Sequence, residues 1–379
     1  MIEDYLQGTL DQLAERAKVL KGRIPTRRLP AVYRGLDQKS RDLTDETIDK
    51  IKRIQTAPEF QLPQNQPQRF RALSGAVQDI DFLETVAISA LVRAGDDDHR
   101  LNSLLGRICD EIEFPLIPPV VTTLSDFSLY YHIYCNLNLM RVPLQESRFM
   151  LHLPDLYHEL CHPLLHETNN PSVEPLRDAA VMALGEVLNY LDQELQKERR
   201  SRSSPYMEFV IQRWQNRWTD WIQELFCDLF AVYTLGPAMA WSHFHLVAKS
   251  GRDTFNYSME KHPSNSARMD GMLYALRLAG FTDEATRIRA HWLELLKTIG
   301  SEPDGVHGRC YPQHLLNRIA ECALKGVQGI KCRIARRDTT GEVHELLNEA
   351  WERFWSAPSD YVEWERQAVE RLFNESADA

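Results

Sequence analysis

The chain has 379 residues, with 44 Lys and Arg against 54 Asp and Glu, and a formal net charge of −10. A dedicated nucleic-acid-binding protein usually carries a basic surface, so no nucleic-acid partner is expected. No run reaches the roughly 18 apolar residues of a membrane span, so no membrane partner is expected. The first residues lack the apolar segment of a secretory signal, and the seven cysteines form no C-x-x-C pair. We therefore expect a cytoplasmic protein.

The first 120 residues read as a helical region. Apolar residues recur at three- and four-residue steps from Ile2 to Leu20, which is the pattern of a helix with one buried face. A second helix is predicted in "TDETIDKIKRIQ", with Thr44 as its N-terminal cap. A third is predicted in "RFRALSGAVQDIDFLETVAISALVRA", which ends before Gly95.

The pattern changes in "LYYHIYCNLNLMRVP", where apolar residues alternate with more polar ones from Leu129 to Leu139. This period of two predicts a strand, although the first half is also compatible with a helix. Later segments return to helical periodicity, namely 172–200, 204–236, 237–250, 267–280, 283–299, 312–326, 341–356 and 359–373. The fold class predicted is mainly α, with a small β element, and with an N-terminal helical region 1–120, a core 121–280 and a C-terminal helical region 281–379.

The stretch "YHELCHP" places His158, Glu159 and His162 in the pattern H-E-x-x-H. Residues four apart lie on one face of a helix, so the two imidazoles can bind one cation. Glu159 on the flank of that face could deprotonate a metal-bound water. Pro163 is expected to end or kink this helix just after His162. The alternative is a helix end with two exposed or capping histidines.

A catalytic zinc needs a third protein ligand and an open position. The extended pattern with a third histidine fails, because its last position falls on Thr168, and His166 lies beyond Pro163. The remaining source is "WIQELFCDLFAVY", which carries Glu224 and Asp228 on a strongly apolar helix. Burying two acids there is costly unless a metal and a histidine N–H compensate them. The alternative is that both acids lie on a solvated edge.

"HELCH" followed by "ELFCD" resembles the gluzincin type of zinc metallopeptidase, over roughly 155–235. The resemblance implies a zincin-like helical core in which His158, His162 and Glu224 bind Zn²⁺. It also implies that Glu159 is the general base and that Asp228 orients the first histidine. The chain departs from the family at Cys161, where glycine is frequent, at Pro163, and in lacking the aminopeptidase motif G-x-M-E-N.

Peptide hydrolysis also requires a donor for the oxyanion of the tetrahedral intermediate. The loop "NYSMEKHPSNSARM" supplies the candidates Tyr257, His262 and Arg268. The alternative is a polar loop with a helix cap at Ser264 or Ser266. The strand before the H-E-x-x-H helix is expected to bind a substrate backbone at its edge.

These patterns predict a zinc-dependent hydrolase, an intracellular metallopeptidase that cleaves a protein or peptide through a zinc-bound water activated by Glu159. The alternative is a helical interaction or regulatory protein with a structural or degenerate zinc site, which would bind a partner protein through its N- or C-terminal helices. A zinc hydrolase acting on a non-peptide amide has the same ligands.

Overall fold

The computed structural model describes residues 2–24, 34–88, 96–123, 130–135, 138–201, 205–251, 253–256 and 261–374. These residues are mainly helical, as the sequence predicts, with one small sheet. The longer helices are α1 (Ile2–Arg23), α2 (Arg34–Thr56), α4 (Gln66–Phe82), α5 (Asp96–Glu111), α6 (Asp155–His166), α7 (Glu174–Ser201), α8 (Pro205–Leu235), α9 (Pro237–Ser250), α10 (Asn265–Leu278), α11 (Thr282–Ile299), α13 (Gln313–Gly329), α14 (Glu342–Ser356) and α15 (Tyr361–Asn374). The short helices are α3 (Pro58–Gln61), α12 (His307–Cys310), η2 (Pro63–Asn65), η3 (Leu83–Ile88), η5 (Glu146–Arg148) and η6 (Pro171–Val173).

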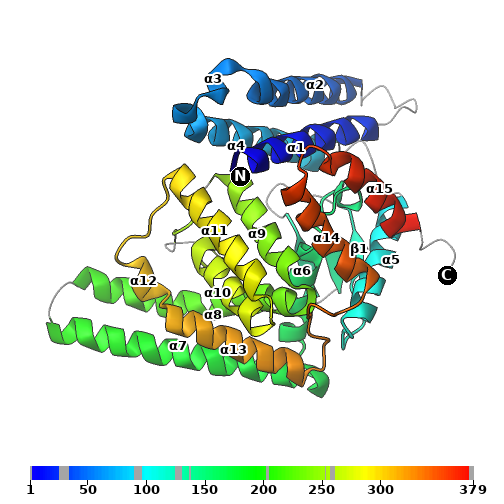
Figure 1. Cartoon of the computed structure of the whole chain (residues 1–379). Helices are drawn as coiled ribbons and strands as arrows, with labels where there is room; N and C mark the ends of the chain where they lie inside the picture. The colour runs from blue at the N-terminus through cyan, green and yellow to red at the C-terminus, as the bar shows by residue number, and fades with distance from the viewer. Residues whose placement is uncertain are drawn as a thin grey trace.

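Figure 1 shows two sets of helices at opposite ends of the molecule, with further helices between them. Helices α1 to α4 lie across one end, where α1 packs on α2 and α2 packs on α4. The long helices α7, α8 and α13 pack on one another at the opposite end. Between them, α6 packs on α8, and α9, α10 and α11 pack together, so the middle of the molecule is built from segments distant in sequence.

A three-stranded sheet precedes α6, in the order β1-β3-β2. Its strands are β1 (Val120–Thr122), β2 (His132–Tyr134) and β3 (Leu139–Arg141). β3 pairs in parallel with β1 and antiparallel with β2. The β element is therefore confirmed, but the one strand predicted from the alternation is two strands. The chain reverses before β3, where Asn138 has a φ of 46°, a conformation that Asn tolerates better than most residues.

One prediction about helix ends is wrong in part and another is wrong. α6 does not end after His162, since it continues through Pro163 to His166, whereas the kink offered as the alternative stays a prediction. A proline removes only one helical hydrogen bond. One further turn follows Pro163, and its last hydrogen bond runs from the Glu167 amide to the Pro163 carbonyl. Thr44 does not cap α2, which begins at Arg34. Its hydroxyl instead donates to the Ser40 carbonyl within the helix, at 2.5 Å.

Helix α8 ends at a sharp corner before α9. Gly236 has a φ of 91° and its amide donates to the Val232 carbonyl, which ends α8. This φ is unfavourable for residues with a Cβ, and Pro237 then begins α9 at its first turn. Trp218 and Trp221 of α8 are fully buried. Helix α8 is therefore anchored on both sides of the segment that carries the two acids.

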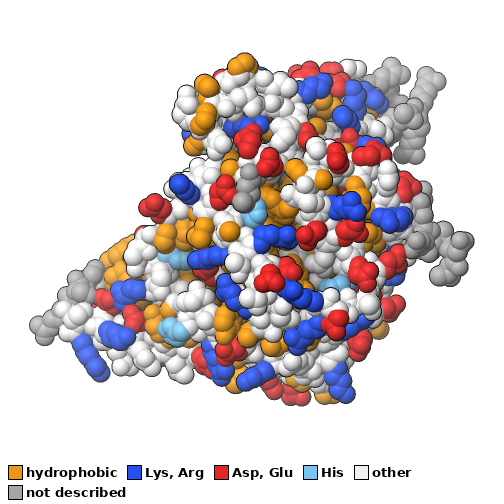
Figure 2. All heavy atoms as spheres, viewed as in Figure 1, with side chains coloured by type: hydrophobic (Ala, Val, Ile, Leu, Met, Phe, Trp, Pro, Cys, Tyr) orange, Lys and Arg blue, Asp and Glu red, His pale blue; other side chains and the backbone are white. Residues whose placement is uncertain are grey.

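The buried apolar residues of the three predicted regions belong to one cluster that extends from Tyr5 to Phe373. The division of the chain at residues 120 and 280 remains a prediction. On the face shown in Figure 2, acidic and basic side chains are interspersed. Among the described residues, no helix combines the length and apolar character that a bilayer span requires.

The C-terminal helix α15 is tied to the segment before α6 by a buried acid. Glu365 is 3% exposed, and its Oε1 accepts hydrogen bonds from the Met150 amide at 2.7 Å and the Tyr361 hydroxyl at 2.9 Å. Burial raises the pKa of Glu365 to about 7. The folded state therefore binds this proton more tightly than the unfolded chain does, and that stabilisation is lost as the pH rises from about 4.5 through 7.

Glu365→Gln cannot ionise, but its amide oxygen can keep both hydrogen bonds. Between pH 5 and pH 8 the free energy of unfolding of the variant, relative to wild type, should therefore rise by roughly 1–3 kcal/mol. Urea denaturation at the two pH values measures this difference. Glu363→Gln, on the exposed face of the same helix, is the control and should show little change. A difference for Glu365→Gln that is independent of pH would contradict the prediction.

Candidate metal centre

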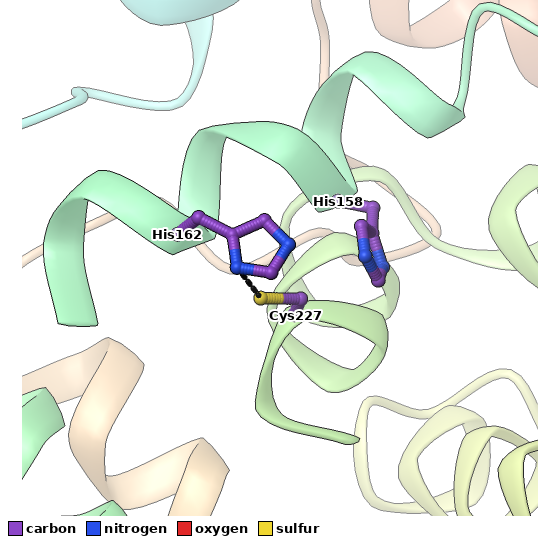
Figure 3. A group of neighbouring side chains, drawn as sticks. All are labelled: His158, His162 and Cys227. Carbon is purple, nitrogen blue, oxygen red and sulfur yellow. Dashed lines mark hydrogen bonds between the residues drawn. The ribbon is translucent and has the colours of Figure 1, made fainter. Parts of the chain in front are cut away.

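Helices α6 and α8 bring the two motifs together. Figure 3 shows His158 and His162 extending from α6 toward α8, where Cys227 lies opposite His162. Glu224 and Asp228 belong to the same helix α8. The i, i+4 spacing in each motif places both histidines on the face of α6 that packs on α8, and both acids on the face of α8 that packs on α6. Residues about 65 positions apart in sequence are therefore in contact.

The Nε2 atoms of both histidines face the carboxylate of Glu224. The distance from His158 Nε2 to Glu224 Oε2 is 3.4 Å, and from His162 Nε2 to Glu224 Oε1 it is 4.0 Å. Two atoms that each bind a tetrahedral zinc at ~2.0–2.1 Å lie about 3.3–3.4 Å apart. The first distance has this value and the second is slightly longer. The two distances end on different oxygens of Glu224, so one oxygen would have to move toward both imidazoles before the three side chains could hold one tetrahedral cation.

The carboxylate of Glu224 also contains an unsatisfied atom. Its Oε2 is buried and accepts no hydrogen bond from the described residues, although His158 and His262 lie 3.4 and 3.3 Å away. The two imidazoles are at ion-pair distance from this oxygen, and a bound cation would give it a closer partner. This atom, together with two imidazoles, is a donor set that Zn²⁺ prefers.

Asp228 is fully buried and holds His158 from the other side. Its Oδ1 lies 2.9 Å from His158 Nδ1, and Arg268 donates to both of its oxygens, from Nε and Nη2, at 2.6 Å. Burial alone would raise the pKa of Asp228, but Arg268 and His158 outweigh it and hold the pKa below its usual range. The alternative in which both acids lie on a solvated edge is therefore wrong for Asp228.

The two histidines differ in protonation. Burial and the neighbouring His158 lower the pKa of His162 to about 4, so its imidazole is neutral at pH 7. Burial also disfavours the charged form of His158, but Asp228 and Glu224 outweigh it and raise its pKa well above the usual value. Metal ligands must be deprotonated, so a cation has to displace a proton from His158 Nε2 while Nδ1 keeps its bond to Asp228.

Glu159 lies in the same cavity as the two histidines. It is 7% exposed, and burial raises its pKa to about 7, with further increases from Glu224 and Asp155 and an opposing hydrogen bond from the Ile133 backbone. A carboxyl group with a pKa near the working pH can both accept and return a proton. The position and the pKa of Glu159 are thus compatible with the base predicted from the motif.

A cavity of about 710 Å³ opens in front of these side chains. Its lining combines the donor groups with the edge of the sheet, and includes Tyr131, His132, Ile133, Glu159, Arg217, Asp220 and Lys261. β2 is an edge strand of the sheet. The strand at the cavity is therefore β2, not the later part of the alternating segment.

Sequence reasoning missed Cys227. Its Sγ lies 3.5 Å from His162 Nδ1, and the metal-binding atoms of His158, His162 and Cys227 lie within 4.8 Å of one another, a group that does not include Glu224. The signal was present in "ELFCD", because Cys227 follows Glu224 by three residues and so shares its helix face. Cys161, at which the chain departs from the family, is buried and does not belong to this group.

The structure places His262 and Arg268 near the site by different contacts. His262 Nε2 lies 3.3 Å from Glu224 Oε2, and its side chain is about half exposed. Arg268 pairs with Asp228. Ser264 caps α10, since its Oγ accepts from the Ala267 amide, so the polar-loop alternative is correct for that residue. The oxyanion role of His262 and Arg268 remains a prediction, and Tyr257 lies outside the described residues.

No protein-family model, curated protein or solved structure matches this chain. The assignment of the site therefore depends on its own geometry and on the motif.

The variant Asp228→Asn tests whether Asp228 orients the ring of His158 for metal binding. The amide has one acceptor oxygen and no charge, so it cannot serve both the imidazole and the guanidinium. The affinity for Zn²⁺ should fall ~10- to 100-fold, as measured by chelator competition on the folded protein. Asp220→Asn removes an exposed acid from the rim of the same cavity and should leave the affinity unchanged. Equal affinities of Asp228→Asn and wild type would mean that Asp228 does not support the ligand.

Proposed function

We propose that the chain is a zinc-dependent hydrolase, a metallopeptidase that cleaves a protein or peptide. The observation that supports this most is that two imidazole Nε2 atoms face the partly buried carboxylate of Glu224, whose Oε2 accepts no hydrogen bond from the described residues. In this proposal His158, His162 and Glu224 are the metal ligands. The zincin-like core belongs to the same proposal.

Each remaining side chain has a separate task in this proposal. Zinc, when bound by three protein ligands, acts as a Lewis acid and lowers the pKa of water. Glu159 accepts a proton in the cavity and returns it to the leaving amine, a task suited to a pKa of about 7. Asp228 fixes the ring of His158, and Arg268 keeps Asp228 ionised. His262 is the donor nearest the ligand carboxylate.

The shape of the cavity supports an extended substrate. The edge strand β2 runs along it, and an edge strand has backbone groups that can pair with another chain. A peptide bound in this way would lie beside Glu159, whose carboxylate accepts from the backbone of Ile133 in that strand. The proposed substrate is therefore a peptide or an unfolded protein segment, held mainly by its backbone.

The ligand assignment is tested by metal content. The purified wild type should contain about one Zn²⁺ per chain, and Glu224→Ala should lose most of it, because two imidazoles alone hold the cation weakly. His158→Ala should lose it as well. Zinc is measured by plasma mass spectrometry, beside circular dichroism to check folding. A folded Glu224→Ala that retains full zinc would remove Glu224 from the ligand set.

The hydrolase assignment is tested by Glu159→Gln, which keeps the size and hydrogen-bonding ability of the side chain but cannot accept the proton. Zinc content should be unchanged, whereas turnover should fall by at least ~10²-fold. Turnover is measured on an unfolded-peptide library, with cleavage products identified by mass spectrometry. The hydrolase proposal would be contradicted if the zinc-loaded wild type and Glu159→Gln cleaved the peptides at the same rate.

A second candidate function follows from Cys227. If Cys227 Sγ, His158 and His162 hold the metal, the site is structural and the chain is a helical interaction protein. Cys227→Ser separates the two, because serine is a poor zinc ligand. The hydrolase proposal predicts near-normal zinc content for Cys227→Ser and loss for Glu224→Ala. The structural alternative predicts the reverse, and chelator competition on both variants decides between them.

A further inference from the structure

A second cavity, of about 620 Å³, lies next to the metal centre. The two cavities share Tyr130, His243, Leu246, His262 and Arg268 in their linings. The second is lined in addition by Arg16 of α1, His152 and Lys249, which is close to the end of α9. None of these three residues has a task in the proposed hydrolysis.

His152 and Arg16 determine each other's hydrogen bonding. His152 is fully buried, and Arg16 directs Nη1 at its Nδ1 from 2.7 Å, while the Tyr130 hydroxyl lies 2.6 Å from the same nitrogen. A guanidinium has donors only and stays protonated in proteins. Glu146 Oε1 also lies near Nδ1, at 3.4 Å, but the shorter contact from Arg16 assigns Nδ1 as an acceptor, so in the neutral ring the N–H is on Nε2.

The N–H of His152 points at Lys249. The distance from His152 Nε2 to Lys249 Nζ is 2.7 Å. An ammonium has three donors and no acceptor, so it cannot receive this bond, whereas an uncharged amine can receive it through its lone pair. The chain of contacts from Arg16 through His152 thus requires the neutral form of Lys249.

The surroundings of Lys249 agree with this requirement. The side chain is 8% exposed, and burial lowers its pKa to about 7, helped by the charge of Arg16 and opposed at longer range by Asp81, Glu146 and Asp155. An ordinary lysine, with a pKa near 10.4, is neutral in only roughly one molecule in two thousand at pH 7. At that pH about half of Lys249 is neutral.

We propose that Lys249 Nζ is a nucleophile that captures small aldehydes or ketones as an imine inside the second cavity. The lone pair of Nζ adds to the carbonyl carbon and the carbonyl oxygen takes up a proton. That proton comes from the nitrogen and leaves a carbinolamine; the second nitrogen proton then passes through solvent to the hydroxyl, the C–O bond breaks with loss of water, and a C=N bond forms. No oxidant or reductant is needed. Neutral, desolvated lysines support this chemistry because the amine must be unprotonated to add.

The test is reductive trapping with acetaldehyde and cyanoborohydride on the full chain, followed by peptide mass spectrometry. At pH 7, Lys249 should be ethylated at least ~10-fold faster than the exposed Lys52 and Lys331. Its rate should level off above about pH 7–8, whereas the rates at the exposed lysines should keep rising toward pH 10. Trapping no faster than at Lys52, or a rate that rises steadily to pH 10, would overturn the proposal.

Two variants make the test specific. Lys249→Met keeps an apolar side chain of similar length and should remove the rapid phase. His152→Gln offers an amide oxygen that can accept from an ammonium, so trapping at pH 7 should fall severalfold and its pH profile should shift upward. An unchanged profile in a folded His152→Gln would mean that His152 does not hold Lys249 neutral. Trapping should be the same in Glu224→Ala, so this inference and the zinc assignment can fail independently.

Discussion

The buried carboxylate of Asp228 is the constraint on which the site depends. An ionised acid in the interior of α8 is tolerated only because α6 supplies an imidazole and α10 supplies a bidentate guanidinium. Breaking a buried pair of this kind typically costs about 3–5 kcal/mol, so the three helices are bound to one relative position. The ring of His158 is fixed through Nδ1, and its Nε2 is thereby turned toward Glu224.

Two arginines influence the protonation of neighbouring side chains in the two cavities. Arg268 keeps Asp228 ionised at the metal centre, and Arg16 makes His152 Nδ1 an acceptor in the second cavity. Because an arginine does not lose its proton, its neighbours must adapt their own protonation to it. His158, paired with Asp228 and Glu224, has a raised pKa and Lys249 has a lowered one, and the two side chains line neighbouring cavities that share Arg268.

The ring of His162 separates two choices of ligand. Its Nε2 faces Glu224 and its Nδ1 faces Cys227, at 4.0 and 3.5 Å. An imidazole binds a given cation through only one of its two nitrogens. A cation on Nε2 would therefore lie on the side of Glu224, and a cation on Nδ1 would lie on the side of Cys227. A carboxylate leaves a hard, open site typical of hydrolysis, whereas a thiolate is typical of structural zinc. The two proposed functions differ in which of these two groups shares a cation with His162.

The sequence alone predicted the mainly helical fold, the helix with His158, Glu159 and His162, and the second helix with Glu224 and Asp228, because periodicity and i, i+4 spacing are local properties of a helix. It did not predict that α6 continues past Pro163, since one missing hydrogen bond is outweighed by the packing of α6 on α8. Nor did it predict the contact of Cys227 with His162, or that of Lys249 with His152. The residues of these two pairs are 65 and 97 positions apart in the sequence. Only the tertiary packing decides which of these side chains come into contact, and the contact in turn decides which side chain of the pair must lose a proton.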